Sequence, residues 1–470
     1  MQIRSIEFKQ RAAEALQDPI LQRALNRARG GFVDKRAAAI ADLPEFDALR
    51  EDAARLKDHI LDHLDYYLER YEQAVQRHGG RVHWARDAAE ARRIVIDICR
   101  NAKARTVCKG KSMVSEEIGL NAALEAEGME VVETDLGEYI IQLAGEPPSH
   151  IIAPAVHKTK DQISDLFRAR HQRPRLTEVP DLVNEARQVL REKFFQADVG
   201  ITGGNFLVAE TGSSIIVTNE GNGDLTQTLA RVHVVVSGIE RVVPTLDDAT
   251  LFLRLLARSA TGQETETYTT ISTGPRRFAD VDGPTEYHVV LVDNGRAQML
   301  GGRFRDMLRC IRCGACMNHC PVYSAIGGHA YGWVYPGPMG SVLTPLFAGL
   351  EAAYDLPNAC TLNGRCETVC PVKIPLPDLL RELRHRQHDE GLTPAGERGL
   401  LRLWAFFAER PRWHERLSRL AARLLHFVGG AKGRIEKLPL TLGWTRARDM
   451  PAPSGKTFLE QWRARGRDDA

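Results

Sequence analysis

The chain of 470 residues lacks any run of 18 or more apolar residues, so we expect no membrane-spanning helix. Its first stretch, MQIRSIEFKQRAAEAL, has neither the apolar core of a secretory signal peptide nor a twin-arginine pair. A strong charge of one sign is also missing, because the net charge is only +2. These absences predict a cytoplasmic protein without general attraction to nucleic acid.

A nucleotide-cofactor signature is missing as well. The glycines between Gly200 and Gly204 do not have the G-x-G-x-x-G spacing of a strand-to-helix turn that binds NAD or a flavin. Any redox chemistry of this chain is therefore expected to use another kind of centre.

Cysteine is scarce except in one short region. Cys99 and Cys108 stand in largely apolar runs, where we expect small buried side chains and no ligand role. The other seven of the nine cysteines lie in CIRCGACMNHCP (310–321) and CTLNGRCETVCP (360–371). The first segment is a complete C-x2-C-x2-C-x3-C-P run, the spacing of bacterial-type iron–sulfur ferredoxins.

The second segment repeats this frame with Asn363 in one cysteine position. In two-cluster ferredoxins the fourth cysteine of each run binds the other cluster, so the two segments predict two clusters. The ligands expected for the first, a 4Fe–4S cluster, are Cys310, Cys313, Cys316 and Cys370. Those expected for the second are Cys320, Cys360 and Cys366. The second centre is then either 3Fe–4S, or 4Fe–4S with its last iron bound to Asn363, water or a substrate.

Two other uses of these cysteines fit the spacing poorly. Zinc ribbons pair two C-x2-C knuckles and have no C-x2-C-x2-C-x3-C-P run. Structural disulfides need an oxidising compartment, which nothing in the N-terminal stretch indicates.

The pattern along the chain predicts a multidomain α/β plus α protein. Residues 1–85 are expected to be helical, 86–300 to form an α/β domain with a largely parallel sheet, and 301–385 to form an all-α ferredoxin-like module. The expected strands of the α/β domain are 93–98, 106–108, 128–133, 214–218, 231–236 and 287–292. The apolar run 232–236 suits a central strand that is covered on both faces.

The last region, 386–470, is expected to hold two amphipathic helices broken near Pro411, followed by an irregular end. Residues 381–470 contain 19 Lys and Arg against 11 Asp and Glu, a net charge of +8, which leaves −6 for the rest. This tail either touches an acidic partner or the inner face of the membrane, or is simply a solvated helical surface. Its candidate docking anchors are Trp444, Phe458 and Trp462.

Two polar, glycine-rich segments stand out in the α/β region, at 109–121 and 200–222. The second predicts a strand, a tight turn at Glu210-Thr-Gly212 and another strand. Such glycines allow backbone N–H groups to approach a small anion, or they serve only the turns of a plain hairpin.

These segments also resemble a known family. GITGGNFLVAETGSSIIVTNEGN, KGKSMVSEEIGLN, HKTKDQISDLF and RVHVVVSGIERVVPTLDDA resemble the LUD (lactate utilisation) domain. With the cysteine module after them, the whole chain resembles the lactate-utilisation protein B family, the iron–sulfur subunit of a cytoplasmic, NAD-independent L-lactate oxidation complex. The resemblance implies a fold akin to CoA transferases and sugar-phosphate isomerases. In that family cysteine is frequent at the position of Asn363, and this chain departs there.

The resemblance also implies two partner subunits, a CCG-domain iron–sulfur protein and a small LUD-domain protein, with a quinone or a membrane-surface carrier as electron acceptor. We therefore expect an electron-transfer subunit rather than the sole catalytic chain. Two alternatives remain open. One is a LUD module that binds or senses a ligand while the clusters control assembly, and the other is a subunit of a heterodisulfide-reductase-like complex.

A ligand pocket of the LUD region would draw on its polar side chains. His157 is a candidate base, and Lys158 or Arg231 is a candidate partner for a carboxylate. Glu116 and Glu117 equally suit the start of a helix. The candidate residues are Glu116, Glu117, His157, Lys158, Asn205, Glu210, Thr211, Gly212 and Arg231.

Overall fold

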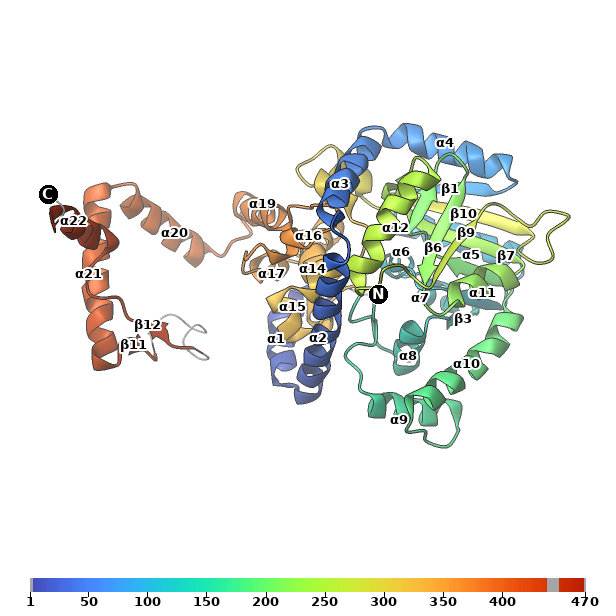
Figure 1. Cartoon of the computed structure of the whole chain (residues 1–470), viewed down its shortest axis with the longest axis horizontal. Coiled ribbons are helices and arrows are strands. Elements are labelled where there is room, and N and C mark those ends of the chain that lie inside the picture. The colour runs from blue at the N-terminus through green and yellow to red at the C-terminus, as the bar shows by residue number, and fades with distance from the viewer. Residues whose placement is uncertain (1–2, 438–447, 469–470) are drawn as a thin grey trace. The chain divides into compact units, whose positions relative to one another are not determined.

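The computed structural model describes residues 3–437 and 448–468 (Figure 1). The chain forms two compact units, Met1–Arg386 and Gln387–Ala470, and each is described by itself. Among the described residues, no helix is both long and apolar enough to cross a membrane.

The centre of the first unit is a six-stranded parallel sheet. In spatial order its strands are β1 (Arg81–Ala85), β10 (Glu286–Val292), β7 (Val232–Gly238), β4 (Val199–Thr202), β2 (Thr106–Lys109) and β3 (Glu130–Glu133). Helices α5 (Ala88–Asn101) and α7 (Leu120–Ala126) pack on one face, and α10 (Val179–Gln196) and α11 (Asn222–Leu229) on the other. The buried strand β7 confirms the prediction of a central strand at 232–236.

A smaller four-stranded sheet packs beside the first. Its order is β8 (Val242–Val243), β5 (Phe206–Val208), β6 (Ser213–Thr218) and β9 (Tyr268–Ser272). β5 and β6 are antiparallel, so the hairpin around 210–212 is confirmed. Gly212 has φ +70°, and a Cβ there would lie 2.5 Å from the backbone N of Val75 in helix α4 (Leu64–Arg77), so this glycine is required by packing.

Two expectations about secondary structure were wrong. Residues 93–98 lie inside α5 and form no strand, because Ala91, Val95 and Ile98 repeat at helical spacing and face the sheet. Residues 81–85, expected to be helical, form β1 at the edge of the sheet.

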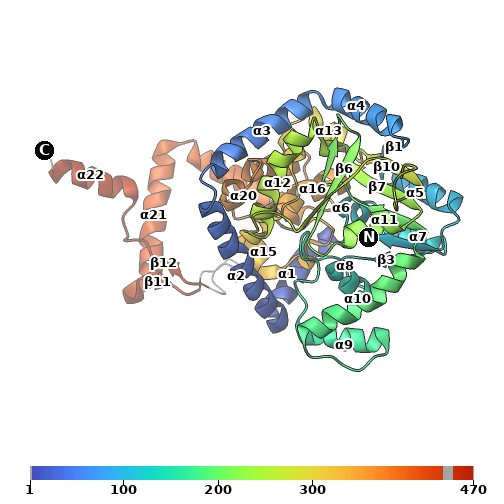
Figure 2. The same cartoon turned by 45° about the vertical axis from the view of Figure 1, so that its right-hand side comes forward.

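The cysteine region is helical, as expected. Its helices are α14 (Ala315–Asn318), α15 (Pro321–Ile326), α16 (Gly337–Ala348), α17 (Asp355–Asn358), α18 (Arg365–Thr368) and α19 (Leu376–Asp389), with the 3-10 turns η3 (Arg305–Arg309) and η4 (His329–Tyr331). Of these, α14, α15 and α17 contact the N-terminal helices, and Figure 2 shows α15 beside them from a second side.

The N-terminal helices join the cysteine region to the sheets. They are α1 (Phe8–Gln17), α2 (Pro19–Ala41), α3 (Phe46–Asp62) and α4, preceded by the turn η1 (Ser5–Glu7). α2 contacts both α15 and α12 (Leu246–Ala260) of the α/β region, and α3 contacts both η3 and α12. One hydrophobic core therefore runs from these helices through the small sheet to the cysteine region.

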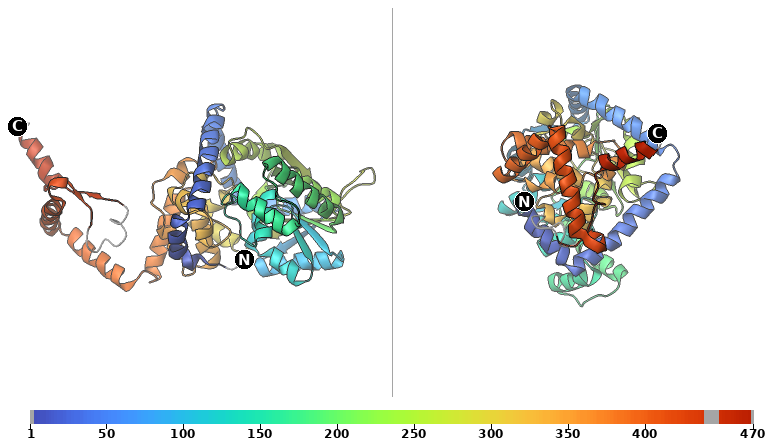
Figure 3. Two further views of the ribbon diagram at one scale, coloured as in Figure 1. Left: turned by 90° about the horizontal axis from the view of Figure 1, so that it is seen from below. Right: turned by 90° about the vertical axis from the view of Figure 1, so that its left-hand side faces the viewer.

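The second unit contains α20 (Ala395–Ala408), α21 (Pro411–Gly429), the turn η5 (Gly430–Lys432), the short pair β11 (Arg434–Ile435) and β12 (Met450–Pro451), and α22 (Phe458–Asp468) (Figure 3). The break at Pro411 is confirmed, whereas the end expected to be irregular is the helix α22. Phe458 and Trp462 are exposed and stack on each other, and Trp444 lies outside the described residues.

Candidate functional site

The two cysteine segments fold into the same local structure. The third residue of each, Arg312 and Leu362, is left-handed with φ of +61° and +55°. Gly314 and Gly364 follow with φ of +76° and +78°, and each begins a four-residue helix, α14 or α18. The backbone frame is therefore repeated even though one cysteine is replaced by asparagine.

Each repeat contributes thiols to two small cavities. The first cavity is lined by four cysteines together with apolar side chains such as Ile151 and Met307. Its cysteines are Cys310, Cys313, Cys316 and Cys370. Three come from the first segment and one from the end of the second, the exchange that two-cluster ferredoxins show.

The second cavity is lined by Cys320, Cys360 and Cys366 together with Asn363. The Asn363 amide oxygen accepts a hydrogen bond from the backbone N–H of Arg365 at 3.1 Å. Cys313 occupies the same position of the first repeat, and there Ala315 donates its N–H to the sulfur. Asn363 is exposed whereas Cys313 is buried, so the second cavity opens to solvent at its non-cysteine corner.

The donor chemistry fits iron–sulfur clusters. Burial and the neighbouring thiols raise the pKa of Cys313 and of Cys366 to about 12. Thiolates packed this closely in apolar surroundings need a cationic centre, which iron supplies. The first cavity offers the full set of four thiols, and the second offers three thiols and an amide.

Backbone N–H groups point at the sulfurs in both cavities. Arg312 donates to Cys310 Sγ at 3.4 Å, and Leu362 donates to Cys360 Sγ at 3.3 Å. Ile374 donates to Cys370 Sγ at 3.4 Å. Such bonds favour the thiolate form and set the potential of a bound cluster.

A third cavity, of about 220 Å³, lies at the carboxyl ends of the parallel strands. Its walls include residues 110–114 after β2 and residues 202–205 at the end of β4. From β2 the chain passes to β3 on one side and then returns to β4 on the other, so this is a switch point of the sheet, where α/β folds bind ligands. Of the nine candidate pocket residues Asn205 lines this cavity, as does Arg312 of the first cysteine segment.

Glu116 and Glu117 face different surroundings. Glu116 lines a separate cavity of about 570 Å³ and pairs with the buried Lys109 at 3.0 Å. Glu117 is buried and holds Arg296 at 2.8 Å, and Tyr335 of the cysteine region donates to it at 2.6 Å. Burial opposes ionisation of Glu117, but Arg296 and these hydrogen bonds lower its pKa below the ordinary value.

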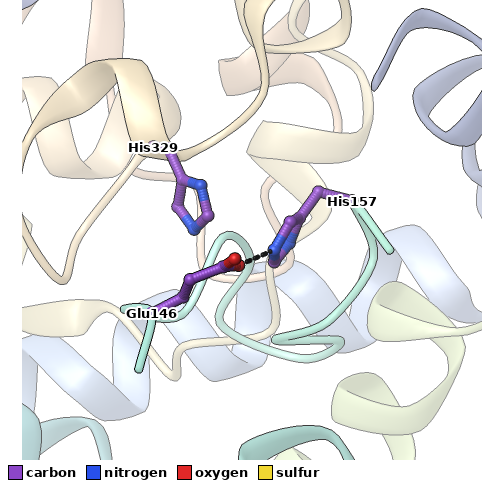
Figure 4. Close-up of side chains that lie close together, drawn as sticks. All are labelled: Glu146, His157 and His329. Carbon is purple, nitrogen blue, oxygen red and sulfur yellow. Dashed lines mark hydrogen bonds and ion pairs between the residues drawn. The ribbon is translucent and has the colours of Figure 1, made fainter. Parts of the chain in front are cut away.

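His157 and Lys158 meet Glu146 at another place (Figure 4). The His157 Nε2 atom lies 2.7 Å from Glu146, and the ring lies against His329 of the cysteine region with centroids 4.4 Å apart. Burial and His329 lower the pKa of His157 to about 4. Glu146, His157 and His329 are close enough to share a metal ion, but the Lys158 ammonium already occupies the carboxylate.

The remaining candidates have structural contacts. Glu210 accepts the N–H of Leu246 at the start of α12, and Thr211 contacts Ser213 within the hairpin. Arg231 is half exposed, 3.5 Å from Glu286, and donates to the carbonyl of Ala102.

Two arginines that sequence reasoning did not select line the third cavity: Arg241 at the end of the turn η2 (Ile239–Arg241), and Arg312. Arg241 stands in the segment RVHVVVSGIERVVPTLDDA and Arg312 between two cysteines, so both lay within quoted motifs. Their only distinguishing signal was a charge inside an otherwise apolar or cysteine-rich run.

Comparison with known proteins agrees with this arrangement. Residues 68–292 match the LUD domain, 306–374 match the 4Fe-4S dicluster domain, which implies two iron–sulfur clusters, and 381–467 match the model described as lactate utilisation protein B, C-terminal. The chain is 43% identical to the uncharacterized electron transport protein YkgF of Escherichia coli, over 96% of this chain and 95% of that protein. It is 42% identical to lactate utilization protein B of Lysinibacillus sphaericus, over 98% of both chains. A crystal structure of a duf162 family protein from Deinococcus radiodurans covers 49% of this chain and 98% of its own, at 15% identity and a TM-score of 0.28.

Proposed function

Because this chain belongs to the lactate utilization protein B family, we propose that it is the electron-transfer subunit of a cytoplasmic complex that oxidises L-lactate to pyruvate without NAD. A partner subunit takes the electron pair from lactate in this proposal, since each iron–sulfur cluster carries one electron at a time. The chain's part is to receive these electrons singly and pass them on.

The observation that carries this proposal is the order of the cavities. Arg312 lines both the third cavity and the first cysteine cavity. The thiols of Cys316 in the first cysteine cavity and Cys366 in the second are close enough to influence each other electrostatically. Asn363, which lines the second cysteine cavity, is exposed to solvent. The three cavities thus form a path from the carboxyl edge of the sheet to solvent.

The chain's own residues hold this path in place. Cys310, Cys313, Cys316 and Cys370 would hold the first cluster, and Cys320, Cys360 and Cys366 the second, with Asn363 at its fourth position. The walls of the first cavity include apolar side chains, and the N–H groups that donate to sulfur would stabilise the more reduced, more negative state of a bound cluster.

The partners that we propose are a CCG-domain iron–sulfur subunit and a small LUD-domain subunit. Support comes from the second unit, where α20 and α21 expose large apolar side chains. Those with about half or more of their surface exposed include Leu400, Trp404, Trp413, Leu420, Leu424 and Phe427. Several large apolar side chains exposed on two neighbouring helices are typical of protein-binding surfaces.

The test is to purify the chain anaerobically, alone and with the two partner subunits, add L-lactate and follow the clusters by EPR. We expect reduction only in the complete complex. The variant Cys366→Ser should lose the second cluster's signal and stop electron transfer, and Cys99→Ser, in the buried face of α5, is the matched control. Oxidation of lactate by the chain alone with a dye acceptor, or clusters that stay oxidised in the complete complex, would refute the proposal.

A further inference from the structure

The third cavity is lined by two largely buried guanidinium groups that share a single carboxylate oxygen as their negative partner. Arg241 is 6% exposed, and the Arg312 side chain is 9% exposed. Both face the same oxygen of Glu240, at 3.8 Å from Arg241 Nε and 3.6 Å from Arg312. Both distances exceed hydrogen-bond range. The other oxygen of Glu240 is committed to Arg296 at 2.7 Å.

Arg312 is also incompletely hydrogen bonded. Its Nε atom is buried and has no partner among the described residues. The guanidinium lies over the ring of Tyr335 at 4.7 Å, and besides the distant Glu240 oxygen it contacts Met339 Sδ at 3.4 Å, a weak acceptor. A buried arginine is usually paired with an anion. Arg312 still has hydrogen-bond donors that a carboxylate could accept.

Around this place the buried positive groups also outnumber the buried carboxylates. The buried guanidinium groups near this place are Arg241, Arg296 and Arg312, and the buried carboxylates are Glu117 and Glu240. Cys310, as a cluster-bound thiolate, would compensate part of this excess from the cysteine side. Of the three guanidinium groups, Arg241 and Arg312 line the third cavity.

Two further polar atoms in the cavity wall could form hydrogen bonds with a neutral polar group of a ligand. Asn222 Oδ1 and Thr218 Oγ1 are buried and have no hydrogen-bond partner among the described residues. Both line the cavity. An amide oxygen accepts a hydrogen bond from a hydroxyl, and a threonine hydroxyl can donate one to a carbonyl oxygen.

From these observations we infer that the third cavity binds a small 2-hydroxy or 2-oxo monocarboxylic acid, with its carboxylate held by Arg241 and Arg312. The volume of about 220 Å³ is below that of drug-sized pockets and suits a molecule of few atoms. Asp135, Glu220, Glu266 and Lys111 also line the cavity, and the three carboxylates disfavour a ligand that carries more than one negative charge. This inference deepens the proposed function, on which the choice of a hydroxy or oxo acid rests.

The site would communicate directly with the first cysteine cavity. The Arg312 backbone N–H donates to Cys310 Sγ, while its side chain would hold the carboxylate. A bound anion would therefore contact the same residue whose backbone N–H donates to Cys310 Sγ. Ligand binding should consequently change the EPR signal of the first cluster, and not only fill a remote cavity.

The experiment is titration calorimetry of the anaerobically purified, cluster-containing full chain with pyruvate and with L-lactate. We expect binding that Arg241→Gln weakens by about tenfold or more, because a charge-assisted contact is lost. Arg241→Lys should keep part of the affinity. Arg231→Gln, at a half-exposed arginine outside the cavity, is the matched control and should bind like the unaltered chain. A shift of the reduced EPR signal on addition of pyruvate is the second expected result.

Because Arg312 lies in the cysteine segment, its variant needs an iron count, and Thr218→Val provides an independent variant away from the cysteines. The inference is overturned if neither acid binds, or if Arg241→Gln and Thr218→Val, with iron content unchanged, both bind as tightly as the unaltered chain. Lactate-driven cluster reduction in the complete complex together with no binding here would leave the proposed function intact and refute this site. Binding of the acid in the third cavity without lactate-driven reduction of the clusters would support this site and refute the proposed function.

Discussion

Tyr335 donates its phenolic hydrogen to the buried carboxylate of Glu117 at 2.6 Å. Tyr335 belongs to the cysteine region and Glu117 to α6 (Met113–Glu117), the helix that follows β2. Through Arg296 the same carboxylate is linked to Glu240, beside the two arginines of the third cavity. The two functional regions are thus joined by a buried polar network, which fixes the first cysteine segment against the carboxyl edge of the sheet.

The first prediction concerns this network. Tyr335→Phe removes one hydrogen bond to a charged group and leaves Glu117 with Arg296 and Asn294, so we expect a loss of about 1.5–3 kcal/mol of stability. Glu117→Gln leaves Arg296 with less buried negative charge, and the loss should reach about 3–5 kcal/mol. Thermal unfolding under anaerobic conditions measures both. Tyr66→Phe, at an exposed tyrosine, is the control, and equal melting temperatures for all four proteins would contradict the prediction.

Much of the fold could be predicted from patterns that act over short distances. The β5–β6 hairpin follows from glycines at its turn, and the buried strand β7 follows from a continuous apolar run. Residues 93–98 were wrongly predicted to form a strand, because an apolar run alone does not distinguish a buried strand from the inner face of a helix. The deciding signal was local, since Asp87 caps the helix by accepting the N–H of Glu90.

The second prediction uses a histidine in the middle of the main sheet. Burial, with His288 nearby, lowers the pKa of His233 to about 3, while an unfolded histidine titrates near 6.5. The unfolded state therefore binds the proton first, and stability that is present above about pH 6.5 is lost as the pH falls toward 3. Between pH 7 and pH 5 this single residue should cost about 2 kcal/mol.

His233→Gln should remove that share of the pH dependence, although it also alters the 2.8 Å hydrogen bond to Thr202 at both pH values. Native-state amide exchange of β4 and β7, measured at pH 7 and pH 5, reports the difference. His78→Gln, at an exposed position, should leave the pH dependence unchanged. A variant at His233 with the same loss between the two pH values would disprove this account.

The third prediction concerns docking through the second unit. Trp404 in α20 is 65% exposed, and its replacement by aspartate places a charge in the apolar face formed with neighbouring leucines. We expect Trp404→Asp to weaken binding of the partner subunits by more than about tenfold while iron content stays constant. Co-purification on a tagged partner measures this. Phe278→Asp, at a fully exposed residue of the first unit, is the control, and normal recovery of Trp404→Asp would argue against this surface.

The candidate site was predictable only where it depends on a sequence frame. The cysteine spacing alone groups the thiols as the two cavities group them. The pairing of Arg241 with Arg312 depends on how the cysteine region packs on the sheet, and no local pattern encodes that contact. For the same reason His157 lies beside His329 and does not line the third cavity, although its segment resembles the LUD domain.

The fourth prediction tests the asymmetry between the two cysteine segments. Asn363→Cys places a thiol where the first segment has Cys313, on a backbone of the same conformation and beside an N–H, that of Arg365, which can donate to it. We expect the second centre to become an ordinary 4Fe–4S cluster, with about one more iron per chain if the natural centre has three. The EPR signal of an oxidised 3Fe–4S centre should then disappear.

Thr361→Cys is the matched control, because it adds a thiol to the wall of the same cavity outside the ligand frame. It should leave the iron content and the spectrum unchanged. If the natural protein already gives two ordinary 4Fe–4S signals, and these are the same in Asn363→Cys and Asn363→Ala, then Asn363 has no special role at the cluster. The exposed corner of the second cavity would in that case serve contact with a partner rather than the ligation of iron.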